Sequence, residues 1–280
     1  MVASLWNHRG SQEMSLDELK SLPAVEETRT YSPLSHYDFI HNTHHIGGEI
    51  LKSHGFELNS TKILVSKDGG RCFFILGYRN GADGIEMAAA GRNSTDKSMS
   101  VAISIGASAR VIVCDNMMVT GDIVVFRRHT GNLFGYLRDK LVLNFHEAKH
   151  RWRNVQADVE VFKGEDFDER DRDHFLMEAF RADILSPRQF DVAVKEVTKP
   201  LHRDRFGADS AWSAYNAMTE GLKLGPVGKV LERHHAAHEF TRRFVGMRDA
   251  VVTEATLDGD DTQQRADAYQ TPENDDDAGM

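Results

Sequence analysis

The sequence predicts an α+β protein. A mostly antiparallel sheet of about five strands fills the N-terminal half and packs with a helical C-terminal half that includes one long helix. Between residues 62 and 126, apolar residues alternate with polar or small ones, and turn-forming residues separate the runs. After Gly131, apolar residues recur every three or four positions, which is typical of helices. With 280 residues, of which 40% are hydrophobic, the chain can bury a substantial core.

The N-terminal region is polar, and we expect residues 1–30 to form an arm ahead of the folded part. The first firm element is a helix that begins after Ser35, an N-cap residue followed by Asp38 at the third helical position. Gly55 ends this helix. The Gly47-Gly48 pair inside it predicts either a kink or close packing, because glycine has no side chain to hold neighbours apart.

The strands are predicted from alternation and from the turns between them. Asp68-Gly69-Gly70 is a strong hairpin signal, because glycine tolerates the positive φ angles of such turns. Met99–Ile105 alternates apolar with small residues, which favours a strand over a competing short helix. The expected strands are residues 62–67, 71–79, 85–90, 99–105, 110–114 and 123–126.

The longest predicted helix runs from Phe134 to Phe162, with an apolar seam at an average spacing of about 3.5 residues. Trp152 falls on this seam and is expected in the core. Further helices are predicted at residues 169–184, from Pro187, at 211–222 and at 227–245. We therefore expect a sheet domain over residues 31–130, a helical region packed on it over 131–250, and a disordered acidic tail over 251–280.

Charge is unevenly distributed along the chain, whose net charge is −9. Residues 256–280 hold eight acidic residues against Arg265, a net of −7. Residues 127–153 hold seven basic residues against two acidic ones, a net of +5. Such runs usually form solvated faces, but a basic stretch in an acidic protein is also typical of a nucleic-acid contact.

We expect a cytoplasmic protein that does not contact a membrane. The sequence has no apolar run of the roughly 20 residues that a membrane span requires. Glu13 and Asp17 interrupt the stretch where a signal peptide would be apolar. Cys72 and Cys114 have no metal or redox spacing, which fits a reducing compartment.

The segment Gly91–Ser98 combines cationic and hydrogen-bonding side chains between two apolar runs. Arg92 can bind phosphate through two hydrogen bonds, and Lys97 adds a point charge. Asn93 and Ser94 add hydrogen-bonding groups, so we predict a phosphate or nucleic-acid site here. The alternative is a solvated hairpin loop in which Asn93 and Asp96 make Asx turns.

A second candidate site begins at Arg127-Arg128-His129 and continues on the long helix. Lys149 and Arg153 lie away from the apolar seam, where a positive stripe can follow a phosphate backbone. An acidic partner helix, or the acidic tail of the chain itself, would satisfy the same stripe.

Five polar or aromatic residues are predicted to serve structure or contacts between the two halves. Asp115 and Asn116 end a buried strand, and Trp212, Asn216 and Glu220 lie on a helix where asparagine is a weak helix former. Such residues favour specific hydrogen bonds, either to the sheet or to a ligand.

No metal site, cofactor or catalytic residue is assigned from the sequence. His234 and His238 have the i, i+4 spacing of zinc ligands, but His235 stands where the glutamate of an HExxH site would be. Histidines on amphipathic helices are more often polar-face residues than ligands.

Four segments occur in an order that resembles the phage and plasmid-like family called domain of unknown function 932. They are SHYDFI at 35–40, GRNSTDKS at 91–98, VCDN at 113–116 and WSAYNAMTE at 212–220. The resemblance spans roughly residues 33–245, and Thr95 stands where many relatives have a histidine. It implies a setting on phages, plasmids or integrated elements, and it brings no established reaction.

The leading hypothesis is a nucleic-acid-binding accessory protein of a mobile element, acting on single strands in replication or recombination. It requires the cationic side chains to meet on one surface. One alternative is a metal-dependent hydrolase or nuclease that uses Asp96, Asp115, Asp122 and nearby histidines. The other is a non-enzymatic assembly or host-inhibitory protein, and homo-oligomerisation stays open.

Overall fold

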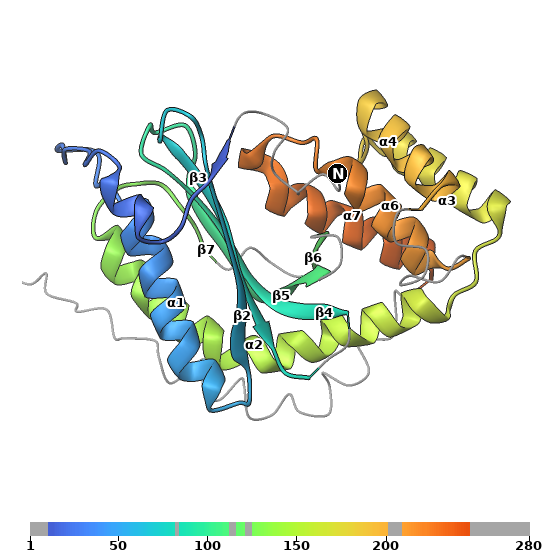
Figure 1. Ribbon diagram of the computed structural model, residues 1–280, viewed down its shortest axis with the longest axis horizontal. Coiled ribbons are helices and arrows are strands. Elements are labelled where there is room, and N and C mark those ends of the chain that lie inside the picture. The colour runs from blue at the N-terminus through green and yellow to red at the C-terminus, as the bar shows by residue number, and fades with distance from the viewer. Residues whose placement is uncertain (1–10, 82–83, 112–115, 121–124, 201–208, 247–280) are drawn as a thin grey trace, which may run out of the picture. The chain divides into compact units, whose positions relative to one another are not determined.

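A computed structural model describes residues 11–81, 84–111, 116–120, 125–200 and 209–246. Contacts between Cα atoms divide the chain into a unit Met1–Val245 and a unit Gly246–Met280, and every element below belongs to the first (Figure 1). In chain order these are β1 (Gln12–Glu13), η2 (Glu18–Ser21), α1 (His36–Lys52), β2 (Glu57–Val65), β3 (Arg71–Arg79), β4 (Ile85–Ser94), β5 (Val101–Val111), β6 (Met117–Val119), β7 (Val125–Arg127), α2 (Leu133–Gly164), α3 (Glu169–Arg181), α4 (Pro187–Thr198), α6 (Ala211–Leu222), η3 (Val227–Lys229) and α7 (Val230–Phe244).

The strands form one antiparallel sheet in the order β1-β2-β3-β4-β5-β6, and β7 also pairs with β5. β5 pairs with β7 through Val101–Ile103 and with β6 through Ser108–Arg110, so the two short strands follow one another along the same edge. The fold class predicted from the sequence is confirmed. The sheet has seven strands where about five are expected, because β1 is very short and β6 lies where no strand is predicted.

Two boundaries differ from the prediction. β5 is one strand of 11 residues, whereas the sequence predicts two strands with a break after Ile105. Gly106 adopts φ +72° at that break, where the register shifts opposite Met87 and Ala89 of β4 and the additional residues of β5 form a bulge. β4 itself continues to Ser94, so half of the expected polar loop at residues 91–98 is strand.

Helices α1 and α2 cover one face of the sheet (Figure 1). The Phe39 ring meets the edge of Phe74 at a centroid distance of 5.1 Å, and Phe145 of α2 meets Tyr78 at 6.1 Å. A Cβ atom at Gly47 would lie 2.4 Å from the Tyr78 hydroxyl and 2.6 Å from the Phe145 ring. Close packing of α1 on the sheet and on α2 therefore explains Gly47, whereas a Cβ atom at Gly48 would have no neighbour within 4 Å.

The opposite face of the sheet packs against α7. Arg92 and Ala90 alternate with residues that face the other way, so both point toward this helix. The apolar part of the contact comprises Leu64, Phe73, Ile75, Ala88, Ala90, Ala102, Met117, Val119, Val230 and Leu231. Behind α7, α6 packs on α4, and Gly221 permits close contact because a Cβ atom there would lie 2.5 Å from the Gln189 carbonyl oxygen.

The predicted seam of the long helix is buried in α2, except at its first residue. Leu137, Leu141, Phe145, Ala148, Trp152, Val155, Val159 and Phe162 are all buried. Phe134 is 46% exposed, and Leu133, beside it in the first turn, is buried in its place. None of the described helices combines the length and the apolar character that a bilayer span demands.

Candidate functional site

Arg92 lies in strand β4 and its guanidinium is buried between the sheet and α7. Its Nη1 donates to Glu232 Oε2 at 2.6 Å, its Nη2 donates to Glu232 Oε1, and the Gly228 carbonyl oxygen accepts a further bond. The Arg92 side chain is only 5% exposed, against 41% for Glu232. The prediction of an open, loop-borne arginine is therefore wrong, because a carboxylate from α7 already occupies the position that a phosphate would take.

Asn93 points to the opposite side of β4 and joins three segments of the chain. Its Nδ2 donates to the Leu34 carbonyl oxygen at 2.8 Å and to Nδ1 of His36 at 2.9 Å. His36 Nε2 in turn donates to the Gly69 carbonyl oxygen at 3.1 Å. Burial lowers the pKa of His36, so the neutral ring that this pattern requires is favoured. These bonds hold the start of α1 against the tip of the β2–β3 hairpin.

Ser94 and Lys97 belong to the turn that connects β4 with β5. Ser94 Oγ donates to the Met99 carbonyl oxygen at 2.8 Å and accepts from the Met99 amide at 3.0 Å, which closes the turn. Lys97 has φ +65° and its Nζ lies 4.6 Å from the centre of the Tyr31 ring. Asp96 makes the Asx turn of the alternative hypothesis by accepting from the Ser98 amide, and it also pairs with Arg71 at 2.9 Å.

The second predicted cationic group, residues 127–129, is not assembled as one surface. The side chain of Arg127 lies outside the described part of the chain, although its backbone belongs to β7. Arg128 is exposed, but His129 is 95% buried and its ring packs against Tyr31 at a centroid distance of 5.4 Å. Burial also lowers the pKa of His129, which opposes the positive charge expected of it.

Asn116 and Asn216 contact each other and join the sheet to α6. Asn116 Nδ2 donates to the Asn216 carbonyl oxygen at 3.0 Å and to its Oδ1 at 3.2 Å. Trp212 stacks on Tyr215 with an angle of 14° between the rings, within the buried side of α6. Glu220 pairs with Lys223 one turn later. Asp115 lies outside the described residues.

The histidines of α7 hold this helix in place. His234 Nδ1 donates to the Met117 carbonyl oxygen of β6 at 2.6 Å, and His238 Nε2 lies 2.8 Å from Asp158 Oδ2 of α2. Within the described ranges, no group of three or more His, Cys, Asp or Glu side chains is arranged to hold a metal ion. Of the aspartates in the hydrolase hypothesis, Asp96 is paired with Arg71, and Asp115 and Asp122 lie outside the described residues.

His234 gives the fold a predictable response to acid. Burial lowers its pKa from 6.5 to about 4, so the folded state favours the neutral ring. The stability that depends on this neutral ring is complete above about pH 6.5 and is lost as the pH falls toward 4. We expect this group alone to lower the free energy of unfolding by about 3 kcal/mol over that interval.

Urea unfolding at pH 7.0, 5.5 and 4.5 measures the effect. The His234→Asn variant keeps a donor near Nδ1 but cannot titrate, so its stability should fall less steeply with pH. Equal slopes for the two proteins would contradict the assignment to His234.

A buried polar cluster that the sequence analysis missed lies at the far end of the α7-facing side of the sheet. Glu86 Oε1 pairs with Arg110 Nη1 at 2.6 Å and accepts from Ser60 Oγ, and Glu86 Oε2 accepts from Asn59 Nδ2 at 2.9 Å. A register shift between Leu58 and Ser60 makes a bulge on β2 that brings both donors to the same carboxylate. The sequence contains one indication of this cluster, namely a glutamate inside the apolar run 85–90.

Gly77 makes this cluster possible. It lies on β3, between Ser60 of β2 and the strand of Glu86, and a Cβ atom there would lie 1.9 Å from Glu86 Oε1. The Glu86 side chain therefore crosses β3 over a glycine to reach Ser60. The Glu86 carboxylate receives all of these bonds from the protein itself. We therefore interpret the cluster as a structural contact that joins β2, β4 and β5 across β3, and not as a ligand site.

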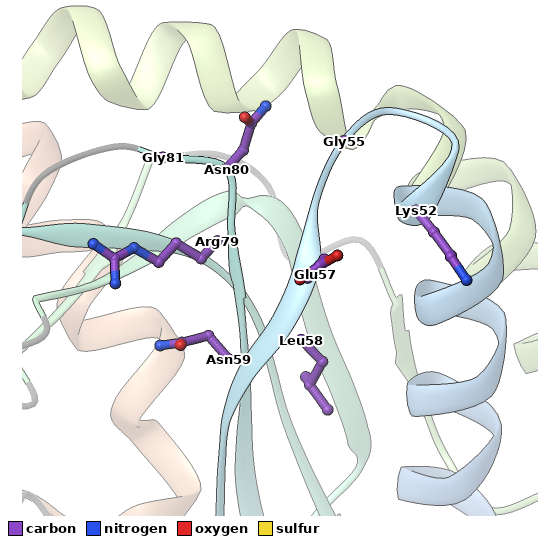
Figure 2. A pocket seen from close by; sticks show the side chains of 8 residues that line it. All are labelled: Lys52, Gly55, Glu57, Leu58, Asn59, Arg79, Asn80 and Gly81. Carbon is purple, nitrogen blue, oxygen red and sulfur yellow. The ribbon is translucent and has the colours of Figure 1, made fainter.

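A pocket of about 360 Å³ adjoins the cluster at the end of β2 and β3. Its walls are Lys52, Gly55, Glu57, Leu58, Asn59, Arg79, Asn80 and Gly81. Figure 2 shows that Asn59 and Arg79 extend to one side of the two strands, whereas Lys52 points away from them on α1. The two cations diverge, so the pocket does not concentrate positive charge.

Two of the predicted site residues, Lys149 and Arg153, lie together on the solvent-facing side of α2. Arg138, Lys149 and Arg153 are exposed on it. At about 100° per residue the three fall within an arc of about 60°, and they span about 22 Å of the helix axis. Within the described chain none of the three forms a salt bridge, whereas their neighbour Arg151 pairs with Glu147. We call these three residues the α2 basic face.

The single cradle expected from the sequence is therefore not formed. Arg92 is enclosed by the sheet and α7, Lys97 lies at a hairpin tip, and only Lys149 and Arg153 share an exposed surface. Arg138 lies on the same side of α2, and the spacing of the three residues along the helix was sufficient to predict this.

No protein-family model, no curated protein and no solved structure matches this chain. What the protein does has to be inferred from its own residues.

Proposed function

We propose that the protein binds nucleic acid through the α2 basic face. The observation that carries the proposal is the group of three exposed cations on one side of a 32-residue helix, free of salt bridges within the described chain. A phosphate backbone presents a line of negative charges, and neutralising them releases counterions. A helix with cations on one side offers a matching line of positive charges.

The setting we propose is that of an accessory protein of a phage, plasmid or integrated element. The four segments that resemble the domain of unknown function 932 family support it. Single strands are the preferred substrate in this proposal, because Val142 is 39% exposed within the arc of the cations and offers unstacked bases an apolar contact. A duplex hides those bases, so a duplex of the same length should bind less tightly.

Charge reversal on the α2 basic face should weaken binding without unfolding the protein. We expect Lys149→Glu/Arg153→Glu to raise the Kd for a 30-nucleotide single strand about tenfold or more at 100 mM salt. The slope of log K against the logarithm of the salt concentration should become shallower by about the amount that two phosphate contacts contribute. Fluorescence anisotropy over a salt series measures both.

The matched control is Arg188→Glu/Lys199→Glu, which reverses two exposed cations at α4 and changes the net charge equally. It should bind like the unaltered protein. If both double variants lose affinity to the same extent, only overall charge matters and the assignment to α2 is wrong.

A second candidate function is docking of a protein partner on the same side of α2. The exposed side chains of Val142 and Leu143 favour it, because exposed large apolar residues often mark an interaction site. In that case Leu143→Glu, rather than the reversal of Lys149 and Arg153, would change the mass of the complex in light scattering.

A further inference from the structure

Two histidines lie among the cations of α2. His146 and His150 are exposed and one turn apart, and Lys149 and Arg153 occupy the neighbouring positions on the same side. All four fall within an arc of about 100° of the helix. A phosphate chain that contacts Lys149 and Arg153 therefore lies within reach of both imidazoles.

The other charged groups near these histidines are few. Glu147, between them in sequence, pairs with Arg151, whose Nη1 also donates to Asn144. The elements that pack on α2 are α1, β3, β5, β7, α6 and α7, and they do so on its buried side. From α7, His238 and Arg242 lie against Asp158 there. Asp139 is exposed on the same side of α2 about two turns before His146, and in the described chain neither His146 nor His150 has a salt bridge.

Helix α1 adds three more histidines to the layer that covers this face of the sheet. His41, His44 and His45 lie together, with the rings of His41 and His45 6.3 Å apart. Partial burial and then its two neighbours lower the pKa of His44. Five of the 14 histidines are thus carried by α1 and α2 beyond the buried His36, and only His146 and His150 lie on the helix of the α2 basic face.

We infer that the α2 basic face binds nucleic acid more tightly in mild acid, because His146 and His150 become additional phosphate contacts when they are protonated. The inference rests on the proposed function and specifies its regulation. Phosphodiester groups and bases keep their charge between pH 8 and 5.5, so a change in affinity over this range reports on the protein.

The test measures the Kd of the full chain for a 30-nucleotide single strand at pH 8.0 and pH 5.5, in 100 mM salt, with a rhodamine label that does not titrate in this range. We expect binding about tenfold tighter at pH 5.5, with a salt slope steeper by up to two contacts. Circular dichroism checks that the fold persists at pH 5.5, which is above the range where His234 is protonated.

The variant His146→Gln/His150→Gln should give the same Kd at both pH values. His174→Gln, on α3 with a 65% exposed side chain, is the matched control and should keep the full response. The salt slope gives a second readout, because in the double variant it should be the same at both pH values.

The outcomes separate the two proposals. Absence of binding at both pH values would overturn the proposed function together with this inference. Equal binding at pH 8.0 and 5.5 would overturn only the inference. A pH response that survives in His146→Gln/His150→Gln would show that other groups cause it, which also overturns the inference.

Discussion

Replacing Gly106 by alanine is expected to lower the free energy of unfolding by about 3 kcal/mol. Two costs add at this position. Gly106 has φ +72°, which L side chains adopt only with strain, and a Cβ atom would lie 2.5 Å from the Cα of Ala148. The backbone of α2 would have to move away from β5, and the contact between them holds the long helix on the sheet.

Urea unfolding of Gly106→Ala measures the loss. The control is Gly55→Ala, because Gly55 has φ +78° but no atom within 4 Å of its added Cβ. The free energy of unfolding of that variant should fall by about 1 kcal/mol, because the substitution introduces conformational strain alone. Equal losses in the two variants would mean that contact with Ala148 contributes nothing.

Removing the carboxylate from Glu232 is expected to cost about 3 kcal/mol. Arg92 would then be left with its charge buried opposite an uncharged α7 side chain. The doubly altered Arg92→Met/Glu232→Leu protein should recover most of the loss, because it removes both charges and fills the space with apolar groups. Thermal and urea unfolding of the two variants give the comparison.

This result also separates structure from binding at the first predicted site. We expect Arg92→Met/Glu232→Leu to bind nucleic acid like the unaltered protein, since Arg92 is enclosed. Loss of binding in a folded double variant would return Arg92 to the binding surface. A Glu232→Ala protein as stable as the original would show that the ion pair does not hold α7.

Local patterns predicted the parts of the fold that depend on local physics. The seam of α2, the Asp68–Gly70 hairpin, the Ser35 cap and the Pro187 start of α4 follow from residues within one or two turns of each other. The continuous β5 was missed because it depends on tertiary contact. Gly106 ends a strand by propensity, but here it is the residue that lets Ala148 approach.

The candidate site residues also fall into two groups, those that local sequence patterns predict and those that depend on tertiary contacts. Lys149 and Arg153 share a surface because helix periodicity places them there, and that is readable from spacing. The partners of Arg92 and Glu86 cannot be predicted from spacing. Glu232 lies 140 positions from Arg92, and Arg110 lies on a strand next to that of Glu86. Asn116 and Asn216 were each recognised as candidates for contacts between the halves, but 100 positions separate them and no local pattern pairs them.

The position of α7 has a consequence for how the chain acquires its structure during synthesis. Strands β2 to β5 pair with sequence neighbours and can form as soon as they leave the ribosome. Arg92 and the Met117 carbonyl, however, receive their partners from Glu232 and His234, which are translated more than a hundred residues later. The nascent sheet therefore exposes one apolar face and the Arg92 guanidinium to solvent until α7 has been synthesised.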